Sequence, residues 1–268
     1  MSTEISSRFT TVARLLSPLS LSLPAAFGEQ LSSLYGLVQR SDYVFGSPLG
    51  PFYHESRHYH IPRFVYFGPE ASAESLRFAF LAGFNHRDLR DTLSLLHFVE
   101  CLALRPDIGR RFNLSLFPLV DVLGLAGLAP DRDLARENWA RTGAPEISLL
   151  EKDARVRGYH GFIRLEAGTG DDAVTVRLRT APRWENPTPD VEMILSEDIA
   201  PFAVRWENAT TNTDGPLAVA DDLPFQPFEL TLRLPGAWTP QLHREATASI
   251  LKRFLLRYCS FMAYGQHL

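Results

Sequence analysis

The sequence predicts an α/β fold: a three-layer domain in which a mixed, mostly parallel sheet carries helices on both faces. Three observations predict it. Residues 76–83 and 114–120 are near-continuous apolar runs, which is typical of central strands covered on both sides. Between them, residues 90–104 repeat apolar side chains at helical spacing. This strand–helix–strand order predicts parallel pairing through a right-handed crossover.

The other elements follow from shorter patterns. Residues 43–51 are rich in Gly and Pro, which favours turns. Alternation of apolar and polar residues, or short apolar runs, predict the remaining strands, and apolar residues at helical spacing predict the remaining helices. Strands are expected at residues 61–67, 161–166, 173–178 and 228–234, and helices at 145–155 and 242–262.

The chain divides into two parts. Residues 1–40 are expected to form a helical lead-in, interrupted at Pro18 and Pro24. Residues 41–268 are expected to form a single α/β domain, because they contain no internal repeat and no low-complexity linker.

Composition restricts the partners. The chain of 268 residues is 45% hydrophobic and 22% charged, which is ordinary for a globular protein. The formal net charge is -4 and the basic residues are scattered, so we expect no nucleic-acid partner. No apolar run reaches the roughly 18 residues of a membrane span, so we expect no membrane partner. The oligomeric state stays open.

The cellular location is less constrained. Residues 15–26 follow two arginines and have part of the layout of a secretory signal, although prolines and serines interrupt them. Cys101 and Cys259 lie in apolar, helical stretches and form no Cys-x-x-Cys pair, which favours two unpaired thiols in a reducing compartment. We therefore predict a cytoplasmic protein, with secretion as the alternative.

Sites in open α/β sheets gather at the carboxyl ends of the strands, so polar residues at strand ends are the candidate site residues. Five short motifs lie at or after such ends. They are Ala82-Gly83-Phe84-Asn85-His86-Arg87-Asp88, Pro118-Leu119-Val120-Asp121-Val122-Leu123-Gly124, Asp133-Leu134-Ala135-Arg136-Glu137-Asn138-Trp139, Arg164-Leu165-Glu166 and Thr231-Leu232-Arg233-Leu234-Pro235.

In this order, these motifs resemble those of the zinc carboxypeptidases and their deacylase relatives, the succinylglutamate desuccinylases and aspartoacylases. The resemblance runs from about Tyr43 to the C-terminus. It implies a zinc-carboxypeptidase-like sheet with helices on both faces, and an ancestry in metal-dependent cleavage of amide bonds.

The resemblance places Asn85, Asp88 and Glu166 at the three zinc-ligand positions, which the family fills with two histidines and a glutamate. No imidazole remains, and the shorter Asp88 draws its carboxylate back, so zinc is expected to bind poorly. An all-oxygen set suits Mg²⁺ or Ca²⁺ better. A frame shifted by one residue offers His86 as an alternative ligand.

The same resemblance places Arg233 at the position of the family's catalytic glutamate. A guanidinium cannot accept a proton at neutral pH, so Arg233 is not expected to act as a general base. Pairing with Glu166 or Asp88 is expected instead, so that a fixed positive charge replaces the metal.

Ligand-binding positions are also implied by the resemblance. Arg136 matches the arginine that binds the substrate's carboxylate or scissile carbonyl, and Asp133 matches the aspartate before it. Asp121 follows a predicted strand at another motif position. An anionic ligand near Arg136 and Arg233 is therefore expected, although Arg136 could instead only anchor its loop.

His54, His58 and His60 suggest a metal cluster, but a polar hairpin edge explains them without a further ligand. The sequence has no Gly-x-Ser-x-Gly elbow, Walker loop or dinucleotide fingerprint.

The sequence therefore predicts a catalytically degenerate carboxypeptidase-like or deacylase-like protein that binds a small anionic molecule or a peptide end and needs no cofactor. One alternative is an active metal-dependent amide hydrolase, with zinc if the family activity is retained. The other is a structural or interaction protein with a vestigial cleft. Bound metal and ligand-dependent stabilisation distinguish the three.

Overall fold

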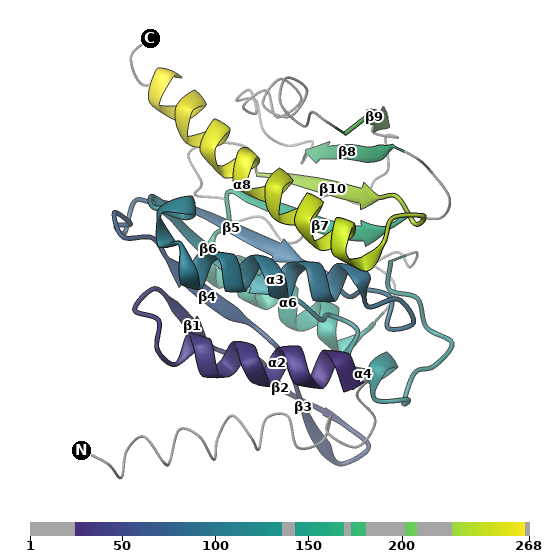
Figure 1. Cartoon of the computed structure of the whole chain (residues 1–268). Coiled ribbons are helices and arrows are strands. Elements are labelled where there is room, and N and C mark those ends of the chain that lie inside the picture. The colour runs from purple at the N-terminus through teal and green to yellow at the C-terminus, as the bar shows by residue number, and fades with distance from the viewer. Residues whose placement is uncertain (1–24, 136–142, 169–172, 181–201, 208–226, 266–268) are drawn as a thin grey trace, which may run out of the picture.

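The computed structural model describes residues 25–135, 143–168, 173–180, 202–207 and 227–265 (Figure 1). Eight strands form one sheet in the order β1-β4-β6-β5-β7-β10-β8-β9, and β2 and β3 form a separate hairpin. The strands are β1 (Val44–Gly46), β2 (Leu49–His54), β3 (Arg57–Ile61), β4 (Phe64–Phe67), β5 (Leu76–Leu81), β6 (Phe112–Phe117), β7 (Gly161–Ala167), β8 (Val174–Thr180), β9 (Val204–Glu207) and β10 (Phe228–Leu234).

The sheet is mixed, with a parallel centre. Strands β6, β5, β7 and β10 run parallel to one another. Strand β1 pairs antiparallel with β4, β4 with β6 and β8 with β10, whereas β9 is parallel to β8. The predicted parallel pairing is confirmed, because β5 and β6 are parallel and α3 (Arg90–Leu104) connects them. The predicted α/β class is confirmed as well.

Helices cover both faces of this sheet. In Figure 1, α2 (Ala25–Val38), α3 and α8 (Pro240–Gly265) lie side by side in front of it, and α6 (Pro145–Arg157) lies behind it. Two short helical segments, η1 (Pro106–Gly109) and α4 (Val122–Leu125), lie in connections. No helix in the described part of the chain is long and apolar enough to cross a membrane.

The core contains residues from all three layers. Phe78 and Phe80 of β5 are fully buried, and the Phe78 ring contacts Phe254 and Tyr258 of α8. Leu31 of α2 is buried in the same cluster, so the second half of the predicted lead-in packs on the sheet domain. The first part of that lead-in, residues 1–24, lies outside the described residues.

The predicted turns at residues 43–51 are wrong, because the structure has β1 and the start of β2 there. Strand β1 is a three-residue edge strand, and β2 carries Pro51 in a two-stranded hairpin. In such places a missing N–H donor costs little, so Gly and Pro do not exclude a strand. The single strand expected at 61–67 is instead the end of β3 and all of β4, and β9 was not predicted.

Candidate functional site

A pocket of about 340 Å³ opens at the carboxyl ends of β5, β7 and β10. The lining brings together most of the residues that the sequence singled out, although they come from four separate motifs. They are Asn85, Asp88, Asp133, Glu166 and Arg233. Arg136 lies outside the described residues.

A glycine after β5 aims the first motif at this pocket. Gly83 has φ +68°, a conformation that L side chains rarely adopt. A Cβ atom there would lie 2.6 Å from Thr92 Oγ1 and 2.8 Å from Leu119 Cα. Only glycine therefore permits the sharp turn that carries Asn85 and Asp88 from the strand end to the start of α3.

Glu166 lies between two guanidinium groups. Its Oε1 is 2.8 Å from Arg164 Nε, and its Oε2 accepts a hydrogen bond of 3.1 Å from Arg233. Arg233 also donates to Glu207 Oε1 at 3.3 Å. Pairing of Arg233 with Glu166 is one of the two arrangements that the sequence predicted. We call Arg164, Glu166, Glu207 and Arg233 the Glu166 cluster.

Strand register explains this cluster. Arg233 of β10 lies directly beside Glu166 of the parallel strand β7. Arg164 is two residues before Glu166, so both side chains leave the same face of β7. Arg164 also lies 4.3 Å from the centre of the Phe84 ring and donates to the Ala135 carbonyl at 2.9 Å. Arg164 was not among the site residues predicted from the sequence, although its spacing from Glu166 indicates a shared face.

Asp88 has a cationic partner of its own. Arg90 Nε donates to both oxygens of Asp88, at 2.9 and 3.1 Å, and Arg90 also binds the Gly236 carbonyl. Burial alone would raise the pKa of Asp88, but the hydrogen bonds and charge of Arg90 lower it below its usual value. Asp88 is therefore a carboxylate that is already neutralised.

Behind these pairs lies a buried acid that the sequence analysis missed. Asp91 Oδ2 accepts the Ala167 N–H at 2.6 Å, and its Oδ1 lies 3.7 Å from His243 Nε2. Burial, with the nearby charge of Asp88, raises the pKa of Asp91 to about 8, and burial lowers the pKa of His243 to about 4. At neutral pH both groups are therefore predominantly uncharged.

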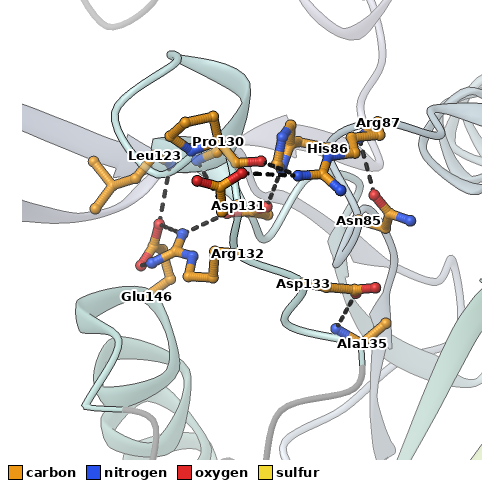
Figure 2. Close-up of polar contacts among 12 residues, drawn as sticks. Asn85, His86, Arg87, Leu123, Pro130, Asp131, Arg132, Asp133, Ala135 and Glu146 are labelled. Atoms are coloured by element: carbon orange, nitrogen blue, oxygen red, sulfur yellow. Dashed lines mark hydrogen bonds and ion pairs between the residues drawn. The ribbon is translucent and has the colours of Figure 1, made fainter.

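Asp121 and His86 take part in a different cluster, part of which Figure 2 shows. Asp121 is fully buried, and its Oδ2 lies 2.6 Å from His86 Nδ1. Arg132 pairs with Asp121 and, at 2.7 Å, with Glu146 Oε1, which also accepts the Leu123 N–H. We call His86, Asp121, Arg132 and Glu146 the Asp121 cluster.

The Asp121 cluster fixes the connection after β6 and contributes no side chain to the pocket lining. Gly124 permits its close packing, because a Cβ there would lie 2.2 Å from Asp121 Oδ2 and 2.3 Å from His86 Nδ1. Asp133, farther along this connection, does line the pocket, and its Oδ1 accepts the Ala135 N–H. The roles predicted for Asp121 and Asp133 in ligand binding stay predictions.

The residues that the resemblance places at the zinc-ligand positions do not fit zinc. Both oxygens of Glu166 face guanidinium groups, Asp88 is held by Arg90, and Asn85 Oδ1 accepts the Arg87 N–H at 3.0 Å. A dication would have to displace arginines at two of the three positions, and it would meet their positive charge. Across the described residues, no three His, Cys, Asp or Glu side chains are grouped so that they could hold a metal ion.

His54, His58 and His60 lie on the β2–β3 hairpin, in agreement with the polar hairpin edge expected from the sequence. His58 stacks edge-on against Tyr53, with ring centres 4.4 Å apart. Burial and the proximity of His58 lower the pKa of His60.

No protein-family model matches the chain, and no curated protein sequence matches it significantly. Solved structures do match. A metallo-carboxypeptidase from Burkholderia cenocepacia superposes with a TM-score of 0.66 at 15% identity, covering 87% of this chain and 69% of that one. A metallo-carboxypeptidase from Pseudomonas aeruginosa, in complex with (2-guanidinoethylmercapto)succinic acid, superposes with a TM-score of 0.62 at 13% identity. The match covers 87% of this chain and 69% of that one.

An aspartoacylase family protein from Mesorhizobium loti also matches, with a TM-score of 0.55 at 13% identity, covering 81% of this chain and 68% of that one. The chain therefore has the fold of the metallo-carboxypeptidase and aspartoacylase proteins, as the sequence motifs predicted. At these identities the similarity establishes the fold and leaves the activity to the chemistry of the pocket.

Proposed function

We propose that the pocket binds a small molecule or a peptide end that bears a carboxylate, and that it has lost zinc-dependent hydrolysis. The contact that carries this proposal is the one between Arg233 and Glu166, at 3.1 Å. It supports the proposal because it sets a positively charged donor beside a carboxylate, at the two positions that the resemblance equates with the family's catalytic base and one of its metal ligands.

Arg233 has donors to spare for a ligand. Within the described part of the chain, its hydrogen bonds to Glu166 and Glu207 each use one terminal nitrogen. A guanidinium carries five N–H donors in a planar fork that matches a carboxylate. The side chain is 33% exposed and lines the pocket, so an incoming carboxylate can reach these donors.

The other charges of the pocket suit a ligand with polar groups of both kinds. Asp88 and Arg90 neutralise each other, and Asp133 adds a carboxylate to the lining. A peptide end or an amino-acid derivative carries both a carboxylate and hydrogen-bond donors. Such a molecule would satisfy this lining better than a simple inorganic anion.

The test uses two probes that differ only in charge: N-acetylglycine and its uncharged amide, N-acetylglycinamide. We expect the melting temperature to rise with N-acetylglycine at millimolar concentration and to stay unchanged with the amide. Isothermal titration calorimetry gives the dissociation constant. Arg233→Gln should weaken binding by about tenfold or more, because a charged hydrogen bond is lost.

Arg111→Gln is the matched control, because Arg111 is exposed, pairs with Glu70 on the surface and lies outside the pocket. It should leave binding unchanged. Equal effects of both probes, or equal affinities of the Arg233 and Arg111 variants, would contradict the proposal. No response to either probe would favour a vestigial cleft instead.

A further inference from the structure

A second pocket, of about 310 Å³, lies between α3 and α8, which pack side by side in Figure 1. Helix α3 contributes His97 and Cys101 to its lining, and α8 contributes Glu245 and Lys252. It shares no lining residue with the pocket at the strand ends and has no part in the function proposed above.

A thiol, an imidazole and a carboxylate are arranged in series at this pocket. His97 and Cys101 are four residues apart and share a face of α3. His97 Nε2 lies 3.7 Å from Cys101 Sγ, and His97 Nδ1 lies 3.2 Å from Glu100 Oε2. When Nδ1 donates its proton to the carboxylate, Nε2 is the acceptor for the thiol proton. This is the arrangement that activates a cysteine as a nucleophile.

The surrounding charges favour proton transfer and an anionic reactant. The Cys101 sulfur, as hydrogen-bond acceptor for the protonated imidazole, outweighs the opposing effect of burial and, with Glu100, raises the pKa of His97. The imidazole therefore takes up a proton more readily than a free histidine. Arg105 and Lys252 also line the pocket, and Glu245 is the one acidic residue among the lining side chains that the structure describes.

The other cysteine provides a comparison within the same chain. Cys259 is also a free, half-buried thiol, but burial raises its pKa. The structure describes no histidine in contact with it. A difference in reactivity between the two cysteines therefore reports the effect of His97 and the pocket.

We propose that Cys101 is a site of thiol–disulfide exchange with small anionic disulfides that bind between α3 and α8. The thiol passes its proton to His97, and the sulfur attacks one sulfur of the disulfide. The disulfide bond breaks, a mixed disulfide forms on Cys101, and the other half leaves as a thiolate that takes the proton from His97. The disulfide is the oxidant, so the step needs no further reactant.

The test follows the intact protein with oxidised glutathione by time-resolved mass spectrometry, and peptide mapping assigns each adduct. We expect Cys101 to react about tenfold faster than Cys259, or more. His97→Gln should slow the reaction at Cys101 by about tenfold or more, because the base is lost. Similar rates at the two cysteines would contradict the proposal, as would a wild-type rate in a folded His97 variant.

A second variant tests the same proton path at a more exposed residue, where the substitution is not expected to unfold the protein. Glu100 is 47% exposed, so Glu100→Gln should leave the melting temperature unchanged while slowing the reaction at Cys101. Cystamine, a cationic disulfide, tests the charge preference. Cys101 of the wild type should react more slowly with cystamine than with oxidised glutathione. In the double variant Arg105→Gln/Lys252→Gln, the difference between these two reaction rates should be smaller. Faster reaction with cystamine would show that the class of reactant is wrong.

Discussion

Two clusters of arginine and acidic side chains form near the carboxyl ends of the parallel strands, and they differ in their contact with solvent. In the Asp121 cluster, both carboxylates are fully buried and Arg132 is only 14% exposed. In the Glu166 cluster, Arg233 is 33% exposed and lines a pocket. The Asp121 cluster is closed to solvent and fixes a connection of the chain. The Glu166 cluster is open to solvent and leaves donors that a ligand can reach.

The largest expected effect concerns the closed cluster. Arg132→Met would leave Asp121 and Glu146 buried without their shared cation, and we expect it to lower the free energy of unfolding by on the order of 3–5 kcal/mol. The melting temperature should fall by about 10 °C, as measured by calorimetry. Arg111→Met, which removes an exposed ion pair with Glu70, is the control and should have little effect. Similar melting temperatures for the two variants would show that the closed cluster does not support the fold.

Asp91 is intermediate between the two clusters in its contact with solvent, because it is buried but lines the pocket that Arg233 also lines. Its pKa of about 8 in the folded protein exceeds the value of about 4 expected in the unfolded chain. The folded state therefore binds more protons between these values, and this group makes the protein less stable as the pH rises from about 4 to about 8. Asp91→Asn should remove that dependence.

The measurement is the melting temperature of the wild type and of Asp91→Asn at pH 5 and at pH 8. At pH 8 the free energy of unfolding of the variant should exceed that of the wild type by on the order of a few kcal/mol. At pH 5 this difference should be much smaller. An equal difference at both pH values would show that Asp91 does not titrate in this window.

The smallest expected effect on stability is in the open cluster. Arg233→Gln leaves Glu166 paired with Arg164 at 2.8 Å, and Glu207 is 39% exposed and free to be hydrated. We expect a loss of about 1 kcal/mol, well below that of Arg132→Met, as measured by urea unfolding. A loss as large as that of Arg132→Met would show that the open cluster is also a structural element.

The sequence predicts the open cluster better than the closed one, for a physical reason. Glu166 and Arg233 lie near the ends of two predicted strands, and the resemblance to the family is what predicted their pairing. The parallel register of β7 and β10 sets them side by side. The closed cluster depends on Arg132, which lies in an irregular connection and reaches back to Asp121. No periodicity indicates such a path.

Other features that the sequence did not predict also depend on the tertiary structure. Asp91 is buried because the Ala167 amide and His243 come to it from distant parts of the chain, which local patterns cannot show. Strands β1 and β2 were missed because Gly and Pro favour turns unless an edge position tolerates them.

The most direct test of the account is the zinc content of the protein after purification without chelator, incubation with excess zinc and removal of unbound metal by gel filtration. Elemental analysis should find far less than one zinc per chain, because arginines already neutralise Glu166 and Asp88. Arg233→Glu, which puts an acidic residue where the resemblance expects the catalytic glutamate, provides a comparison in which a positive side-chain charge becomes a negative one. Near-stoichiometric zinc in the wild type would contradict the account and identify the pocket as a metal site.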